Sequence, residues 1–138
     1  MAEDLGVTMK LPPLQPRSRR AHEAAHWARS HGRFDDYHDG VFRAFFERGD
    51  DIGTVDVLVA LAEELGLPGP SLREALEQRT FEAAVLGDED AARTLGLSGV
   101  PAFVADRRAA LTGVQPVEHL EQLIAHVRTV APPPRRAE

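Results

Sequence analysis

The sequence predicts a mainly α protein of the α+β class: a bundle of about five to six helices, a short antiparallel β-hairpin and a C-terminal helix. Three observations predict it. Apolar residues recur with the helical period over most of residues 18–96. The period changes to that of short strands at 102–105 and 109–112, and becomes helical again at 117–129. Helices followed by a single hairpin do not give the alternating order of a parallel sheet.

The composition is that of one globular domain. The chain has 138 residues, enough to bury a core without disulfides or metals. Hydrophobic residues make up 43% and charged residues 28% of it, unlike a disordered chain. The net charge of -6 argues against nucleic acid or an anionic membrane as the main partner. No apolar run approaches the roughly 20 residues of a membrane span, and no cofactor is expected.

The sequence contains no cysteine. This excludes disulfides, thiolate metal sites and any thiol chemistry supplied by this chain alone. The first ten residues, MAEDLGVTMK, have neither the basic region nor the apolar region of a signal peptide. We therefore expect a cytoplasmic protein.

Residues 1–17 are expected to form an extended, Pro-rich segment, and a helical subdomain follows over 18–96. Its first helix covers about 19–31, with Ser18 as N-cap and Gly32 as the stop. The stripe that packs this helix against the core consists of alanines: Ala21, Ala24, Ala25 and Ala28.

A second helix is predicted over about 34–48. It carries five apolar residues at i, i+3, i+7, i+8 and i+11, and we expect this stripe to face the core rather than a ligand. The five residues are Phe34, Tyr37, Val41, Phe42 and Phe45.

Two further helices are expected before residue 80. The first, over about 55–65, follows Thr54 as N-cap. The second, over about 72–79, is opened by Ser71 and Glu74, whose spacing is that of a capping box.

The remaining chain divides into shorter pieces. Two short helices are expected at 80–86 and 89–95, the second capped by Asp88. Residues 97–130 form a strand–strand–helix unit, and residues 131–138, a Pro-rich charged tail, are expected to be disordered.

The stretch HEAAH fits the pattern of zinc-dependent proteases. On a helix, His22 and His26 lie on one face, and Glu23 between them is placed as general base for a zinc-bound water. A catalytic zinc needs a third protein ligand. Gly32 stands where one extended form of the motif needs its third histidine. The zinc site is therefore a minor hypothesis beside an ordinary Ala-rich helix.

Arginines gather at the start of the first helix. Arg17, Arg19 and Arg20 place positive charge at the positive end of the helix dipole. This arrangement is unfavourable for the isolated helix, so an acidic partner is expected there, within the protein or outside it. Trp27 lies beside the alanine stripe, and its spacing does not decide between core and interface.

Four stretches resemble, in order, parts of the DsbA-like thioredoxin-fold proteins: RAHEAAHWARSHGRFDDYHDGVFRAFFERGDDIG, VLVALAEELGL, ARTLGLSGVPAFV and LTGVQPVEHLEQLI. The most similar subgroup is the FrnE type, related to hydroxychromene-carboxylate isomerases and kappa-class glutathione transferases. The resemblance runs from about Leu5 to Ile124. It implies a cis proline at Pro101, preceded by Val100, at a corner that contacts substrate. It also implies that HEAAH lies in an Ala-rich helix without zinc.

The resemblance covers the helical insertion and the C-terminal half of the family fold, a truncated DsbA-like thioredoxin fold. The family's dithiol-bearing portion has no counterpart in this sequence, so the resemblance transfers no catalytic residue. A hairpin of two strands is marginal in water. We therefore expect its edge to be covered by helices or by another chain.

Three functional hypotheses follow. The first is a redox-inactive binding or assembly module, expected to form a homodimer through the hairpin edge or a helical face and to take a polypeptide as substrate or partner. The alternative is a fragment of a longer, active cytoplasmic protein disulfide oxidoreductase or glutathione-dependent isomerase. The third is zinc binding at His22 and His26.

Overall fold

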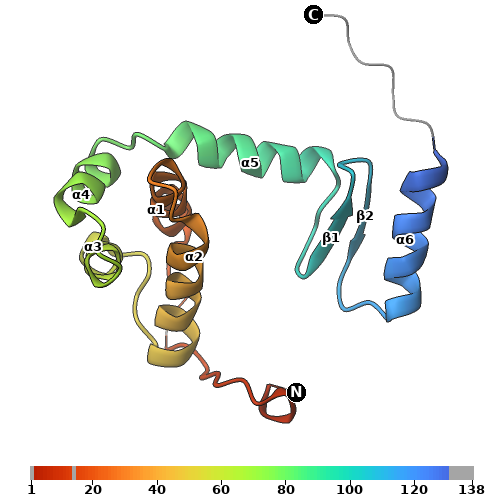
Figure 1. The fold of residues 1–138 in the computed structure, drawn as a ribbon, viewed down its shortest axis with the longest axis horizontal. Helices are drawn as coiled ribbons and strands as arrows, with labels where there is room; N and C mark the ends of the chain where they lie inside the picture. Colours follow the sequence, from red (N-terminus) through yellow and green to blue (C-terminus); the bar gives the residue numbers. More distant parts are fainter. Residues whose placement is uncertain (1, 14, 131–138) are drawn as a thin grey trace, which may run out of the picture. The chain divides into compact units, whose positions relative to one another are not determined.

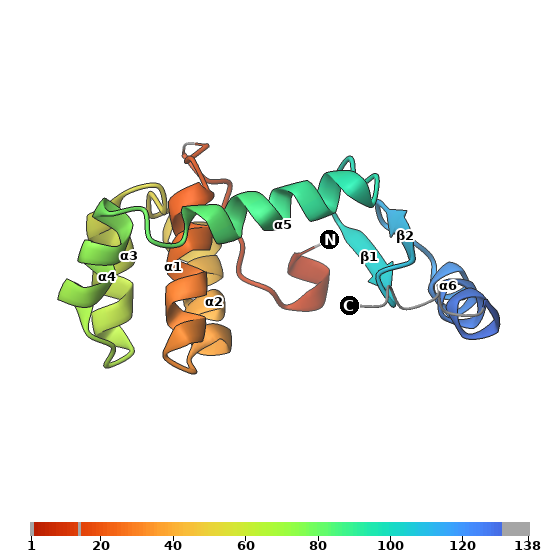
Figure 2. The same ribbon diagram turned by 90° about the horizontal axis from the view of Figure 1, so that it is seen from above.

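The computed structural model describes residues 2–13 and 15–130, and its ribbon is drawn in Figures 1 and 2. The chain divides into two compact units, Met1–Gly87 and Asp88–Glu138. The division falls inside a helix, and the boundary expected at 96–97 lies just after that helix ends. The mainly helical fold with one antiparallel hairpin is confirmed. The tail expected to be disordered, 131–138, lies outside the described residues.

The first unit is helical. A short 3-10 turn at Glu3–Leu5 precedes it, and a π-helical turn at Ala44–Arg48 extends its second helix. Residues 7–12 have no regular secondary structure. The helices are α1 (Arg19–Ser30), α2 (Phe34–Arg43), α3 (Val55–Glu64) and α4 (Gly69–Glu77), and α5 (Glu82–Thr94) begins in this unit.

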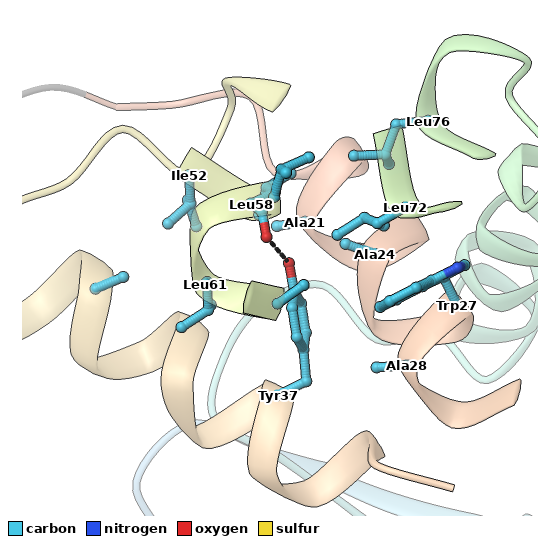
Figure 3. Packing of buried hydrophobic residues seen from close by; sticks show 13 residues of the cluster. Ala21, Ala24, Trp27, Ala28, Tyr37, Ile52, Leu58, Leu61, Leu72 and Leu76 are labelled. Carbon is cyan, nitrogen blue, oxygen red and sulfur yellow. Dashed lines mark hydrogen bonds between the residues drawn. The ribbon is translucent and has the colours of Figure 1, made fainter. Parts of the chain in front are cut away.

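Four helices of the first unit share one core, seen from close by in Figure 3. All four alanines of the predicted stripe on α1 are buried, as is Trp27. Tyr37 of α2 is fully buried, and its hydroxyl donates a hydrogen bond to the carbonyl oxygen of Leu58 on α3 at 2.9 Å. Leu72 and Leu76 bring α4 into the same core. The small alanines let α1 lie close to its neighbours.

Two of the four cap predictions, those at Ser71 and Asp88, are wrong. Ser71 lies inside α4 rather than before it, and its hydroxyl accepts a hydrogen bond from Trp27 Nε1 at 3.3 Å. The helix begins three residues earlier than predicted, at Gly69, because Pro70 fits the first turn of a helix, where no amide hydrogen is needed. Ser18 and Thr54 stand at the N-cap positions, but neither side chain makes a capping hydrogen bond.

The second wrong cap is Asp88. The two short helices predicted at 80–86 and 89–95 form one continuous helix, α5, with Gly87 and Asp88 inside it. A glycine inside a helix costs only about 1 kcal/mol relative to alanine. The acidic and alanine-rich residues around it sustain the helix.

The second unit contains the end of α5, strands β1 (Ala102–Ala105) and β2 (Ala109–Thr112), and helix α6 (Val117–Thr129), at the predicted bounds. The strands are antiparallel and pair Ala102 with Thr112 and Ala105 with Ala109. The turn residues Asp106 and Arg107 have positive φ of 50° and 56°. This is the backbone of a tight hairpin turn, formed here without the usual Asn-Gly or Asp-Gly pair.

Helix α6 packs against both strands but has no buried residue. Arg108 closes its C-terminal end by donating hydrogen bonds to the carbonyl oxygens of Val127 and Val130. Those carbonyls have no partner inside the helix, so the guanidinium replaces the missing amides. The described part of the chain has no helix that is long and apolar enough to cross a lipid bilayer.

Candidate functional sites

The three residues of HEAAH that carry the zinc hypothesis lie in different environments. His22 is exposed, His26 is half-buried, and Glu23 is 1% exposed. The carboxylate of Glu23 accepts a hydrogen bond from Arg79 Nε at 3.1 Å, and Arg79 Nη2 lies 3.0 Å from its second oxygen. Glu23 is therefore held in a structural ion pair, away from the position of a general base.

Residues 2–13 and 15–130 contain no group of three or more His, Cys, Asp or Glu side chains placed to hold a metal ion. The third ligand that a catalytic zinc needs is thus not provided by the described side chains. The geometry gives HEAAH the role of an ordinary helix surface, with its glutamate turned into the core.

Val100 and Pro101 lie at the corner before β1, where the resemblance places a substrate contact. Their peptide bond is cis. Val100 is 91% exposed, and Pro101 is also exposed. The carbonyl oxygen of Pro101 accepts a hydrogen bond from the amide of Gly113 at 2.8 Å, which ties the corner to the end of β2. The structure thus presents an apolar side chain at the open edge of a two-stranded sheet.

A third candidate lies in the first unit and was missed by the sequence analysis. An apolar pocket of about 240 Å³ opens between α1 and the end of α2. Ala21 and Ala25 line it from α1, and Phe42 and Phe45 line it from α2 and the π-helical turn. The predicted core stripe of α2 included Phe42, but this side chain is 50% exposed. The prediction was wrong there because five residues at helical spacing span more of the helix surface than one buried face.

Comparison with known proteins places these sites in a family. The model of the DSBA-like thioredoxin domain matches residues 1–125. The chain belongs to the DsbA-like thioredoxin family. This confirms the resemblance read from the four sequence stretches, and it includes both the Val100–Pro101 corner and the apolar pocket within the matched region.

Two similar proteins show how much of a longer chain this sequence covers. The structure is similar to that of the probable DsbA oxidoreductase SCO1869 from Streptomyces coelicolor, with a TM-score of 0.80, 26% identity, and coverage of 99% of this chain and 60% of that one. The uncharacterized protein YwbO of Bacillus subtilis is 42% identical over 84 residues, which are 59% of this chain and 42% of YwbO. The chain therefore spans about half the length of these relatives.

Proposed function

We propose that this DsbA-like chain is a polypeptide-binding module that performs no thiol–disulfide exchange with its own residues. Exchange begins with the attack of a thiolate on a disulfide sulfur. The sequence contains no cysteine that could supply this thiolate. These residues can therefore bind a client polypeptide on their surface, but they cannot exchange its disulfides.

The observation that carries the proposal is the open hairpin with Val100 beside it. Within residues 2–13 and 15–130 the sheet has two strands, so the outer edge of each strand has no sheet partner among these residues. Such an edge pairs readily with an extended chain, whose backbone supplies affinity while its side chains fill neighbouring pockets. Val100, 91% exposed at the start of β1, gives the incoming chain an apolar contact.

The proposal is tested by titrating the isotope-labelled chain with a permanently unfolded, carboxymethylated polypeptide and recording amide NMR spectra. We expect shifts in the amides of Ala102–Ala105, and Val100→Asp should weaken binding about tenfold. Val117→Asp is the matched control, because it places the same charge at an exposed valine of α6. Shifts confined to other residues, or equal binding by both variants, would contradict the proposal.

A homodimer is the other way to cover the hairpin edge. Sedimentation of the chain alone separates the two arrangements. A dimer that Val100→Asp dissociates would mean that a second copy occupies the edge. A monomer of 15.1 kDa would leave the edge to a client.

A second candidate function is favoured by the lengths of the relatives. SCO1869, described as a probable DsbA oxidoreductase, has a chain of which this one covers 60%. A dithiol supplied from outside these 138 residues would make the whole protein a disulfide oxidoreductase or a glutathione-dependent isomerase of the FrnE type. The intact mass of the protein from its native cells tests this: a mass above 15.1 kDa together with thiol content would favour it.

A further inference from the structure

We propose that the client polypeptide pairs with the outer edge of β1, through the backbone groups of Ala102 and Val104, and that it is an uncharged, extended segment. This inference rests on the polypeptide binding proposed above, and it names the strand, the backbone groups and the class of client. Three observations carry it: the direction of the backbone groups, the partial closure of β2 at Thr112 and the absence of charge around β1.

The hydrogen bond between Gly113 and Pro101 fixes which backbone groups of β1 point outward. These two residues stand directly opposite each other, one position beyond the first pair of the two strands. In an antiparallel ladder, hydrogen-bonded pairs alternate with pairs whose backbone groups point away from the partner strand. Phe103 is therefore bonded to β2, whereas Ala102 and Val104 turn their amide and carbonyl groups to the outer side.

These outward groups have the spacing that an extended chain recognises. Within residues 2–13 and 15–130, no backbone group from outside the hairpin bonds to the amide or the carbonyl of Ala102 or Val104. An extended chain presents donors and acceptors at the same two-residue repeat, so it can pair with both positions at once. A helix uses its own backbone groups internally and would leave these groups unpaired.

The outer edge of β2 is partly closed by its own chain. The same alternation turns the backbone groups of Ala110 and Thr112 outward. The carbonyl oxygen of Thr112 already accepts a hydrogen bond from Gln115 Nε2 at 2.7 Å. Gln115 is held in turn by His119, whose Nδ1 lies 3.0 Å from its Oε1. A chain pairing with β2 would have to displace this side chain, so β1 is the favoured edge.

The surroundings of β1 favour a client without charge. Residues 95–105 contain no Asp, Glu, Lys, Arg or His, although 28% of the whole chain is charged. Edge strands that stay free usually carry charged residues that oppose pairing, and Ala102–Ala105 carries none. A charged client side chain beside this strand would lose water without gaining a partner. The client segment that fits is therefore uncharged along the length that pairs with β1.

One face of the paired client lies beside Val104. Leu111 lines a hollow together with Leu123 of α6, so its face of the hairpin is the one that α6 covers. Val104 and its partner Ala110 lie on the opposite face, where Val104 is 42% exposed. Directly opposed residues share a face, so the client residue opposite Val104 contacts it there. The small side chains of Ala102 and Ala110 leave room for a branched or aromatic residue.

The first test is amide hydrogen exchange of the isotope-labelled chain, with and without the carboxymethylated polypeptide, followed by NMR. We expect binding to slow exchange at least about tenfold at Ala102 and Val104, because these amides point toward the client. The amide of Phe103 is bonded to β2 in either state and should change less. The amides of Ala110 and Thr112 should stay fast, which distinguishes the edge of β1 from that of β2.

The second test removes one outward amide hydrogen from each strand. Val104→Pro leaves the ladder to β2 intact and should weaken binding of the polypeptide about tenfold. Ala110→Pro is the matched control, because it removes the outward amide directly opposite on β2 and should leave binding unchanged. A protected amide at Leu111 verifies that the hairpin is formed in both variants.

The third test addresses the class of client with short dye-labelled peptides and fluorescence polarisation. A peptide of alternating valine and threonine should bind saturably. Replacing every threonine by glutamate, or every threonine by lysine, should weaken binding about tenfold in both cases, because either charge loses hydration beside β1. Tighter binding of one charged peptide than of the valine–threonine peptide would contradict the uncharged client.

The outcomes separate this inference from the function on which it rests. Polypeptide binding without slower exchange at Ala102 and Val104, or with equal losses in the two proline variants, would overturn the assignment to β1 and leave the proposed function standing. No binding of the polypeptide at all would overturn the proposed function itself. Slow exchange of the same two amides in the chain alone, reversed by dilution, would give the edge to a second copy of this chain instead of a client.

Discussion

Arg79 and Glu23, 56 positions apart in the sequence, form a fork-shaped ion pair that joins the end of α4 to the buried side of α1. The two contacts measure 3.1 and 3.0 Å, and the carboxylate is 1% exposed. Arg79 reaches it from a left-handed backbone conformation, with φ of +54°. Glycine is the usual residue there. The ion pair thus stabilises an arginine at a position whose left-handed backbone conformation favours glycine.

Two substitutions of Arg79 should separate the contribution of the ion pair from the cost of the left-handed backbone. Arg79→Ala leaves the Glu23 carboxylate buried without a counter-charge, so we expect the free energy of unfolding to fall by about 3 kcal/mol. Arg79→Gly loses the same ion pair but relieves the left-handed conformation, so its loss should be smaller by about 1 kcal/mol. Urea denaturation followed by the emission of Trp27 measures both variants. Equal losses would contradict the backbone part of this argument.

The ion pair also bears on zinc binding. Because Glu23 is engaged with Arg79, the motif loses its general base, and residues 2–13 and 15–130 hold no group of three side chains placed to bind a metal ion. We expect that equilibrium dialysis against a stoichiometric amount of zinc gives the same binding for the wild type and His26→Ala. Tighter binding by the wild type would restore the zinc hypothesis, and His119→Ala controls for general loss of an imidazole.

Tyr37 should make stability depend on alkaline pH. Its burial disfavours the phenolate and raises the pKa of Tyr37 well above its usual value. The unfolded chain ionises near pH 10, so the contribution of Tyr37 is fully present below about pH 10 and falls above it by about 1.4 kcal/mol per pH unit.

The comparison with Tyr37→Phe isolates this contribution from other groups that titrate in the same range. Tyr37→Phe keeps the ring but removes the hydrogen bond to Leu58, at a cost of about 1 kcal/mol near neutral pH. Urea denaturation between roughly pH 8 and 11 should show the two stabilities converging as the pH rises. Tyr37 is the one tyrosine in the sequence, so phenolate absorbance reports it alone. Phenolate absorbance near pH 10 in the folded protein would contradict the prediction.

The sequence predicted those features that depend on local periodicity. The alanine stripe of α1, the strands at 102–105 and 109–112 and helix α6 have the predicted positions because each is set by neighbours along the chain. The Ser71 cap failed because α4 begins at Gly69, with Pro70 in its first turn, so Ser71 lies inside the helix. Two start signals stood close together in the sequence, and spacing alone did not show which one the helix uses.

The candidate sites also divide into those that a local motif predicts and those that depend on contacts between distant residues. Val100 and Pro101 were found from a short motif, whereas the apolar pocket depends on how α1 and the end of α2 pack. The signal that could have found it is the four-residue spacing of Phe34, His38, Phe42 and Phe46, a second stripe beside the core stripe. The pairing of Glu23 with Arg79 had no sequence signal, since it joins residues 56 positions apart.

Gly87 and Gly96 provide a matched test of the continuous helix α5. A Cβ atom added at either position meets nothing within 4 Å, so the two sites differ in backbone alone. Gly87 lies inside α5, whereas Gly96 follows its end with φ of +71°. Gly87→Ala should stabilise the helix by about 1 kcal/mol, and Gly96→Ala should destabilise the chain by about 1–2 kcal/mol.

Circular dichroism and thermal denaturation measure the two substitutions side by side. We expect higher helix content and a higher melting temperature for Gly87→Ala, and the reverse for Gly96→Ala. If residues 80–95 were instead two short helices meeting at Gly87, alanine there would bring no gain in helix content. Lower stability of Gly87→Ala would therefore favour the broken helix that the sequence first indicated. A gain would establish that one helix links the two compact units.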